Sequence, residues 1–178
     1  MAAHYKYPHS VINNYLADHL EEANLLPKMI KVTRNGRQVN YGTIVGEEMV
    51  PEMSGPNVAT NNYIVFTVAR DDNEHTEYEK FETIAYQIYT KGKNTGYDLK
   101  DALVDALGRR DFTTDDLMYY QLDQRGKESF HFFNVELNVI EVAGAMNNGK
   151  EAGYYLSTIL VSYSYTYEMD DRGKRLNV

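Results

Sequence analysis

The feature that most constrains this sequence is a pair of long strand-type segments in its last third, Phe130–Val142 and Tyr154–Glu168. They are joined by residues 143–153, which include Asn148-Gly149, and Asn-Gly favours the positive φ angles of a tight reversal. The two segments therefore predict a β-hairpin. The second segment would span about 50 Å if unbroken, whereas a compact domain of this length is about 40 Å across. We expect the hairpin to protrude, to bend sharply, or to pack against another subunit.

The second segment alternates two kinds of side chain, because one face would carry tyrosine and aliphatic residues and the other mainly serine, threonine and leucine. The chain has 16 tyrosines and no tryptophan. Tyrosine is enriched in interfaces, where its ring packs while its hydroxyl keeps a polar contact. A β-rich protein without an interface would also favour tyrosine. For this segment we favour an interface, and the candidate subunit-interface residues are Tyr155, Tyr163, Tyr165 and Tyr167.

Length, charge and cysteine content limit the class of protein. The 178 residues predict one domain, 1–178, with a sizeable core. The net charge of −8 argues against a broad basic face for nucleic acid, but it does not exclude a surface past which DNA slides, since like charge discourages binding. The absence of cysteine excludes disulfides, thiolate metal sites and thiol nucleophiles. No apolar segment approaches a membrane span and no secretory signal is recognisable, so we expect synthesis in the cytosol and no membrane partner.

The rest of the chain alternates helical and strand patterns. Helices are predicted at Ser10–Asn24, at Asp98–Leu107 after a loop at Lys91–Gly96, and, shorter, at Thr114–Gln121. Strands are predicted at Met29–Val32 and Gln38–Tyr41 around Asn35-Gly36, and at Tyr63–Ala69 and Phe81–Thr90, with much of Gly42–Asn62 as loop. This order predicts an α+β fold: an antiparallel or mixed β-sheet with helices packed on one face and a long C-terminal β-hairpin.

An acidic segment separates two of these strands. Its acids are Asp71, Asp72, Glu74, Glu77 and Glu79, with few apolar residues between them. We expect an exposed loop that faces solvent or, in a ring, the wall of a pore.

The sequence offers no catalytic constellation. His75 lies between Glu74 and Glu77, but the spacing differs from the helical zinc motif, so a solvated loop is the better interpretation. His19 and His131 are expected to be packed histidines. The glycines and lysines of Lys91–Gly96 do not follow the order of a phosphate-binding loop. We therefore expect no catalytic residue, no cofactor and no metal site, and no enzymatic activity.

Taken in order, the segments resemble the tail terminator, or tail completion, proteins of long-tailed bacteriophages. The resemblance covers most of the chain and rests on order and texture rather than on a fixed motif. It is carried by the helix Ser10–Asn24, the hairpin around Asn35-Gly36, the strands Tyr63–Val68 and Thr83–Tyr89, the helix from Asp98, and the closing strands Phe132–Leu137 and Leu160–Tyr165.

This resemblance implies a homohexameric ring that caps the tail tube, stops its polymerisation and offers a surface to the head connector. The implied partners are copies of the chain itself, the tail tube or sheath protein and neighbouring neck proteins, with DNA passing through the lumen without specific binding. The implied locations are the host cytoplasm during assembly and then the virion. Alternatives are another neck, head-completion or connector protein, a monomeric ligand-binding or immunity-type domain, and an enzyme with a dispersed site.

Overall fold

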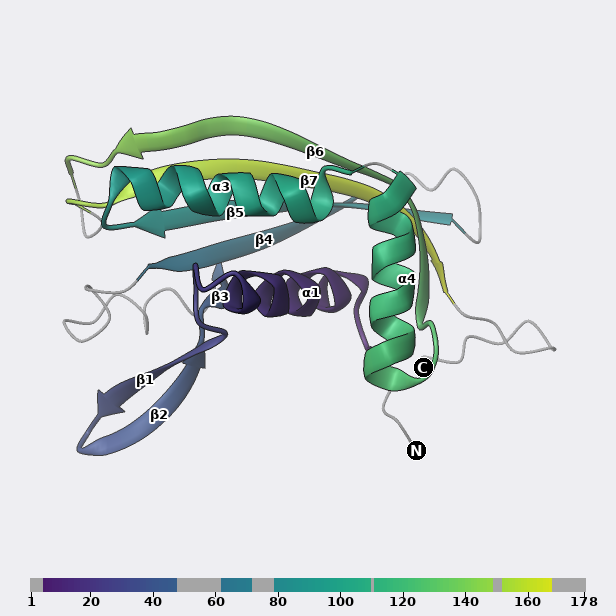
Figure 1. The fold of residues 1–178 in the computed structure, drawn as a ribbon, viewed down its shortest axis with the longest axis horizontal. Coiled ribbons are helices and arrows are strands. Elements are labelled where there is room, and N and C mark those ends of the chain that lie inside the picture. Colours follow the sequence, from purple (N-terminus) through teal and green to yellow (C-terminus); the bar gives the residue numbers. More distant parts are fainter. Residues whose placement is uncertain (1–4, 48–61, 72–78, 110, 149–151, 168–178) are drawn as a thin grey trace.

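The computed structural model describes residues 5–47, 62–71, 79–109, 111–148 and 152–167. The elements follow in the order α1 (Pro8–Glu22), β1 (Met29–Arg34), β2 (Arg37–Gly42), β3 (Ile44–Gly46), β4 (Tyr63–Asp71), β5 (Glu79–Thr90), α3 (Lys93–Leu107), α4 (Asp111–Arg125), β6 (Phe130–Ala145) and β7 (Tyr155–Tyr167). They form a five-stranded mixed sheet and a separate two-stranded hairpin (Figure 1). The predicted α+β class is confirmed.

The five-stranded sheet has the strand order β3-β4-β5-β7-β6. Only β3 and β4 are parallel, and the other neighbours are antiparallel. β7 lies between β5 and β6, so that Ile159 is opposite Tyr86 on one side and Val139 on the other. Of the three alternatives expected for the C-terminal hairpin, protrusion is therefore wrong, because its second strand is held on both edges by strands of the same chain.

The two long strands fit because they bend. The pairing of β6 with β7 shifts register between Phe133 and Glu136 and twice more between Val139 and Gly144. Asn134 and Ala143 have φ angles of 52° and 46°, which are uncommon for residues with a side chain. Such bulges bend a strand and increase its twist. Figure 1 shows β6 and β7 curving along their length.

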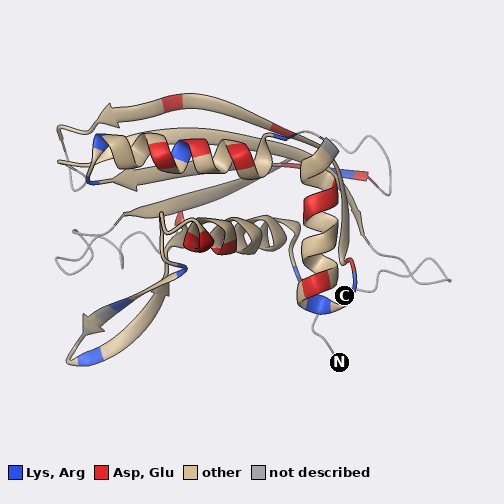
Figure 2. Cartoon of the chain, viewed as in Figure 1, with Lys and Arg blue, Asp and Glu red and all other residues tan. Residues whose placement is uncertain are grey.

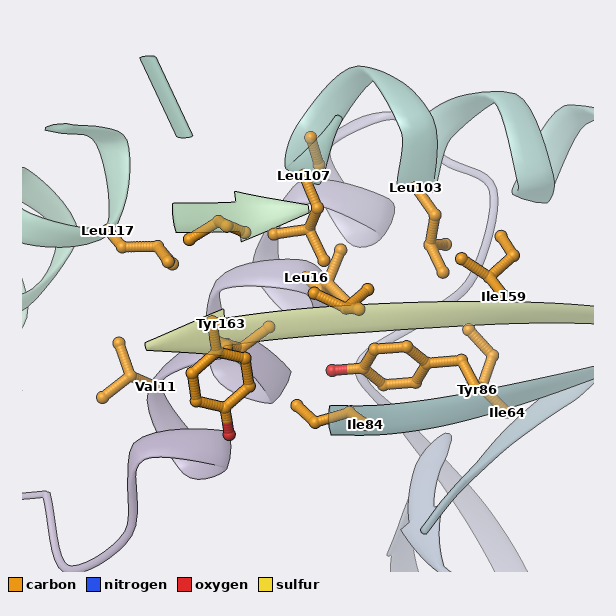
Figure 3. Close-up of a cluster of buried hydrophobic side chains, with 14 of the residues drawn as sticks. Val11, Leu16, Ile64, Ile84, Tyr86, Leu103, Leu107, Leu117, Ile159 and Tyr163 are labelled. Atoms are coloured by element: carbon orange, nitrogen blue, oxygen red, sulfur yellow. The ribbon is translucent and has the colours of Figure 1, made fainter. Parts of the chain in front are cut away.

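All three helices of the described chain pack on one face of the sheet, as predicted. Their buried side chains join those of β4 to β7 in one hydrophobic cluster, which includes Leu16 of α1, Leu103 of α3 and Leu117 of α4 (Figure 3). α3 buries Leu99, Ala102, Leu103, Ala106 and Leu107, the stripe expected from their helical spacing.

The helix boundaries differ from the predicted ones. α3 begins at Lys93 with Gly92 as its N-cap residue, so Asp98 is inside the helix and Lys91–Gly96 is not a loop. α1 begins at Pro8, which suits a first helical position because that residue needs no N–H partner. α4 extends beyond the predicted short helix at both ends.

The β1–β2 hairpin, residues 29–42, extends away from the body of the molecule and is called the arm (Figure 1). Its reversal uses positive φ at Asn35 and Gly36, which confirms the prediction from the Asn-Gly pair. At its base, Tyr41 joins a second, smaller cluster on the helix-free side of the sheet, formed with Val45, Tyr63, Val65 and Tyr154. Beyond this base β2 is exposed from Arg37 to Asn40.

Candidate assembly surfaces

The tyrosines of β7 that were predicted to form a subunit interface mostly face the protein's own core. Tyr163 and Tyr165 are 0% and 2% exposed, and their hydroxyls donate to the two carboxylate oxygens of Glu82, at 2.7 and 3.0 Å. Burial, and then the neighbouring Glu82 carboxylate, raise the pKa of Tyr163 well above its ordinary value. Burial also raises the pKa of Tyr165. The interface assignment of Tyr163 and Tyr165 is therefore wrong, because the monomer already covers both side chains.

Tyr155 and Tyr167 lie at the two ends of β7 and are half-buried. The ring of Tyr167 packs against those of Phe130 and Tyr165, with centroids 5.7 and 5.5 Å away. A contact between these two tyrosines and another subunit stays a prediction.

The acidic segment is shorter than expected. Asp71 is the last residue of β4, opposite Phe81, and Glu79 opens β5 opposite Thr166, half-buried. Asp72, Glu74 and Glu77 lie outside the described residues. That this segment faces solvent or a pore stays a prediction.

The side of the sheet that faces away from the helices carries a different set of side chains, which sequence reasoning had not assigned to an interface. The pairing registers place Thr158, Leu160 and Ser162 of β7 beside Gln87, Ala85 and Thr83 of β5, with Thr67 and Ala69 of β4 beyond them. Phe81 continues the β5 row and is 39% exposed. We call these nine residues the open face; all are half-buried or exposed, and none is charged.

Acidic residues border the open face. Glu136 and Glu141 of β6 are exposed and lie opposite Ser162 and Thr158. On the far side, Glu47 accepts a hydrogen bond from the Thr67 hydroxyl at 3.3 Å. An uncharged centre inside a charged border is the arrangement found in protein–protein interfaces, whose centres are depleted of charged residues.

A second exposed apolar region follows one face of α4. Phe112, Tyr119 and Leu122 are 65%, 63% and 41% exposed, and exposed Asp115 lies between the first two. Their spacings of three and four residues place all four on one side of the helix, opposite the buried Leu117 and Gln121. We call these four residues the α4 stripe.

Gln121 shows why the stripe points outward, because it ties the opposite side of α4 to the sheet. Its amide nitrogen donates to the Phe130 carbonyl at 2.9 Å, and its amide oxygen accepts from the N–H groups of Ser129 and Phe130 at 2.9 and 3.0 Å. These bonds fix the rotation of α4 against the start of β6.

The described residues show no constellation with clear chemistry. Among them, no group of three or more histidine, cysteine or acidic side chains is placed to hold a metal ion. His19 stacks loosely on Tyr15, with ring centroids 6.3 Å apart. His131 was expected to be packed, but its side chain is 59% exposed and contacts Glu128, because alternation along β6 turns Phe130 and Phe132 inward instead. A groove of about 540 Å³ is lined by residues 134–138 of β6 together with Gly108 and Thr114.

No helix in the described segments has the length and apolar character needed to cross a bilayer.

The described residues thus present three surface features for interpretation: the open face, the α4 stripe and the arm. Comparison with protein-family models and with curated proteins gave no match to this chain, so these surfaces themselves are the basis for inferring its function.

Proposed function

We propose that this protein is a self-associating structural component of a bacteriophage neck, of the tail-terminator type, which forms a ring that caps the tail tube and joins it to the head. One observation carries the proposal: the open face, nine neighbouring uncharged side chains on the helix-free side of the sheet. A ring component needs such a surface, since each subunit must cover part of the next.

The composition of the chain makes this absence of charge informative. A quarter of the residues are charged, and the total charge is −8. A solvated sheet face in such a chain would be expected to carry its share of lysine and glutamate. The open face instead has hydroxyl, alanine, leucine and phenylalanine side chains and one amide, Gln87. Small side chains allow close approach, and Leu160 and Phe81 supply apolar area, so the face suits contact with a protein better than contact with water.

The acidic balance fits a ring with DNA in its lumen. A negative wall repels the phosphate backbone, so DNA would pass without being held. Six identical subunits related by rotation close a ring through heterologous contacts, in which two different patches of each copy meet. The molecule offers such different patches on the open face, the arm and α4.

A charge placed in the open face tests the proposal. Leu160→Lys puts an ammonium group at the centre of the face without touching the helix side of the sheet. We expect the wild-type chain to form a ring in light scattering and electron microscopy, and Leu160→Lys to be a folded monomer. The matched control is Asn94→Lys, which adds the same charge at an exposed position of α3 on the opposite side.

Two results would count against the proposal. A wild-type protein that remains monomeric at high concentration would favour a monomeric ligand-binding domain. A ring that forms but does not stop polymerisation of the tail tube protein would favour another neck or connector protein. We expect the ring to bind tube ends and to limit tube length in a mixture with tube subunits.

A further inference from the structure

The arm is the basic part of an otherwise acidic protein. Residues 29–42 contain Lys31, Arg34 and Arg37 and no acidic residue. Because these three charges belong to a total of −8, the remainder of the chain carries −11. Figure 2 shows the contrast, with blue positions on β1 and β2 and mostly red positions on the helices. Such a separation of charge favours contacts between different parts of different copies.

The arm also carries exposed apolar side chains. Val39 is 37% exposed on one face of the hairpin, and Met29, 55% exposed, lies on the other face, because it pairs with Gly42 whereas Val39 pairs with Val32. Alternation along β2 places Arg37 on the same face as Val39, two residues apart, so this face combines a cation with an apolar group. A two-stranded hairpin is marginally stable in water on its own, and within the described residues the arm packs into a hydrophobic cluster of the body at its base, through Tyr41 and Ile30. The exposed part is thus suited to being covered by a partner.

The α4 stripe has the complementary pattern. Asp115 lies between the exposed rings of Phe112 and Tyr119, with Leu122 one turn beyond. The lengths also agree: from Phe112 to Leu122 the helix rises about 15 Å, and a six-residue strand of the arm spans about 20 Å. The arm is therefore long enough to cover the whole stripe.

The arm and α4 of one chain lie at opposite ends of the molecule, with the arm at lower left and α4 at right in Figure 1. A contact between these two surfaces consequently needs two copies. We infer that the arm of each subunit docks on the α4 stripe of the next copy of this chain. The inference rests on the proposed ring function and specifies how neighbouring subunits are held, since a contact between two different patches is what closes a ring.

A protein surface is a better partner for the exposed part of the arm than a nucleic acid is. A hairpin that binds phosphates would gain little from the exposed Val39, which shares a face with Arg37. The acidic body behind it would also repel a polyanion at close range. An acidic, partly apolar helix offers a carboxylate to Arg37 and apolar side chains to Val39, which lie on the same face of the arm.

Charge exchange between the two surfaces tests the inference. Arg37→Asp and Asp115→Arg each place like charges together, and we expect either substitution alone to shift the ring to the monomer mass of 20.5 kDa in light scattering. The double variant Arg37→Asp/Asp115→Arg restores the opposite charges and should recover the ring. This recovery separates loss of contact from misfolding, because a misfolded single variant would not be repaired by the second change.

Cross-linking provides an independent measurement, since the chain has no cysteine. We expect Val39→Cys protein mixed with Tyr119→Cys protein to form a disulfide-linked pair on oxidation. The control mixture pairs Val39→Cys with Tyr97→Cys, which replaces an exposed tyrosine of α3, and should give little cross-linking.

The outcomes distinguish the two proposals. A wild-type ring that is unchanged by both single charge reversals, with no cross-link above the control, would overturn the arm contact and leave the ring function standing. A wild-type chain that never forms a ring would overturn the function itself and the contact with it. Loss of binding to duplex DNA in Arg37→Asp, with an unchanged ring, would show that the arm serves nucleic acid and would also refute the contact.

Discussion

Tyr163→Phe gives the sharpest test of the corrected role of β7. The substitution keeps the buried ring and removes only the hydroxyl that donates to Glu82 at 2.7 Å. Glu82 is 1% exposed, so water cannot readily replace the lost donor. Hydrogen bonds to charged groups contribute about 1.5–3 kcal/mol, and we expect a loss of this size in the free energy of unfolding. For a domain of this length, a loss of about 2 kcal/mol corresponds to about 4–8 °C in Tm.

The assay is urea unfolding, followed by circular dichroism at one fixed protein concentration, because self-association would add concentration-dependent stability. Tyr97→Phe removes the same hydroxyl from an exposed residue and should change stability by less than about 0.5 kcal/mol. If Tyr163→Phe lost as little stability as Tyr97→Phe and also changed the mass of the ring, the core assignment would be refuted and Tyr163 would again be an interface residue. An unchanged ring mass with the expected loss of stability supports the core role.

Three further predictions concern the core. Burial raises the pKa of both Tyr86 and Tyr163 well above the ordinary tyrosine value. Their contribution to the free energy of unfolding is therefore present below about pH 10 and is lost above it, where the tyrosines of the unfolded chain ionise. A free energy of unfolding that is unchanged well above that pH would contradict this. Gly96→Ala places a methyl group 3.1 Å from Thr90 Oγ1 and 3.3 Å from Ala143 Cβ. We expect overpacking to destabilise the protein by about 1–3 kcal/mol, which exceeds the gain in helix propensity. A variant that is more stable than wild type in urea would show instead that the neighbouring side chains move aside. Gln121→Leu deprives the N–H groups of Ser129 and Phe130 of their acceptor. The free energy of unfolding, measured by thermal unfolding, should fall by about 1–3 kcal/mol for each of these two N–H groups. A variant as stable as wild type would refute this.

Sequence patterns identified most of the elements because their periodicity was strong. The arm reversal followed from Asn35-Gly36, and α3 from its leucine and alanine stripe. β3 was missed because three residues are too few to show alternation. The start of α3 was misplaced because Gly92 and Gly96 weaken the local helical signal. Gly96 is nevertheless suited to its position, where α3 approaches β5 and β6 closely.

Tyr163 and Tyr165 were assigned to an interface although they lie on the core face of β7. The two-residue alternation was correct, but it cannot say which face is buried, and a change of face reverses the role of every side chain. A clue was available in β5, where Glu82 shares the parity of Ile84, Tyr86 and Ile88. A carboxylate on a core face needs donors, and tyrosines on the neighbouring strand can supply them. Surface features such as the α4 stripe depend on how α4 is rotated against β6, which only the three-dimensional contacts define.

The central position of β7 has a consequence for the timing of the proposed ring assembly. Residues that pair across the middle of the sheet, such as Ile84 and Val161, are far apart in the chain. Pairings between such distant residues form slowly during folding. Until β7 has entered between β5 and β6, both neighbours have unsatisfied backbone edges, and the three residues that β7 contributes to the nine-residue open face are not yet in place. In the proposed ring, a newly made chain would therefore have to finish its own sheet before binding another copy through this face, which would keep incompletely folded subunits out of the ring.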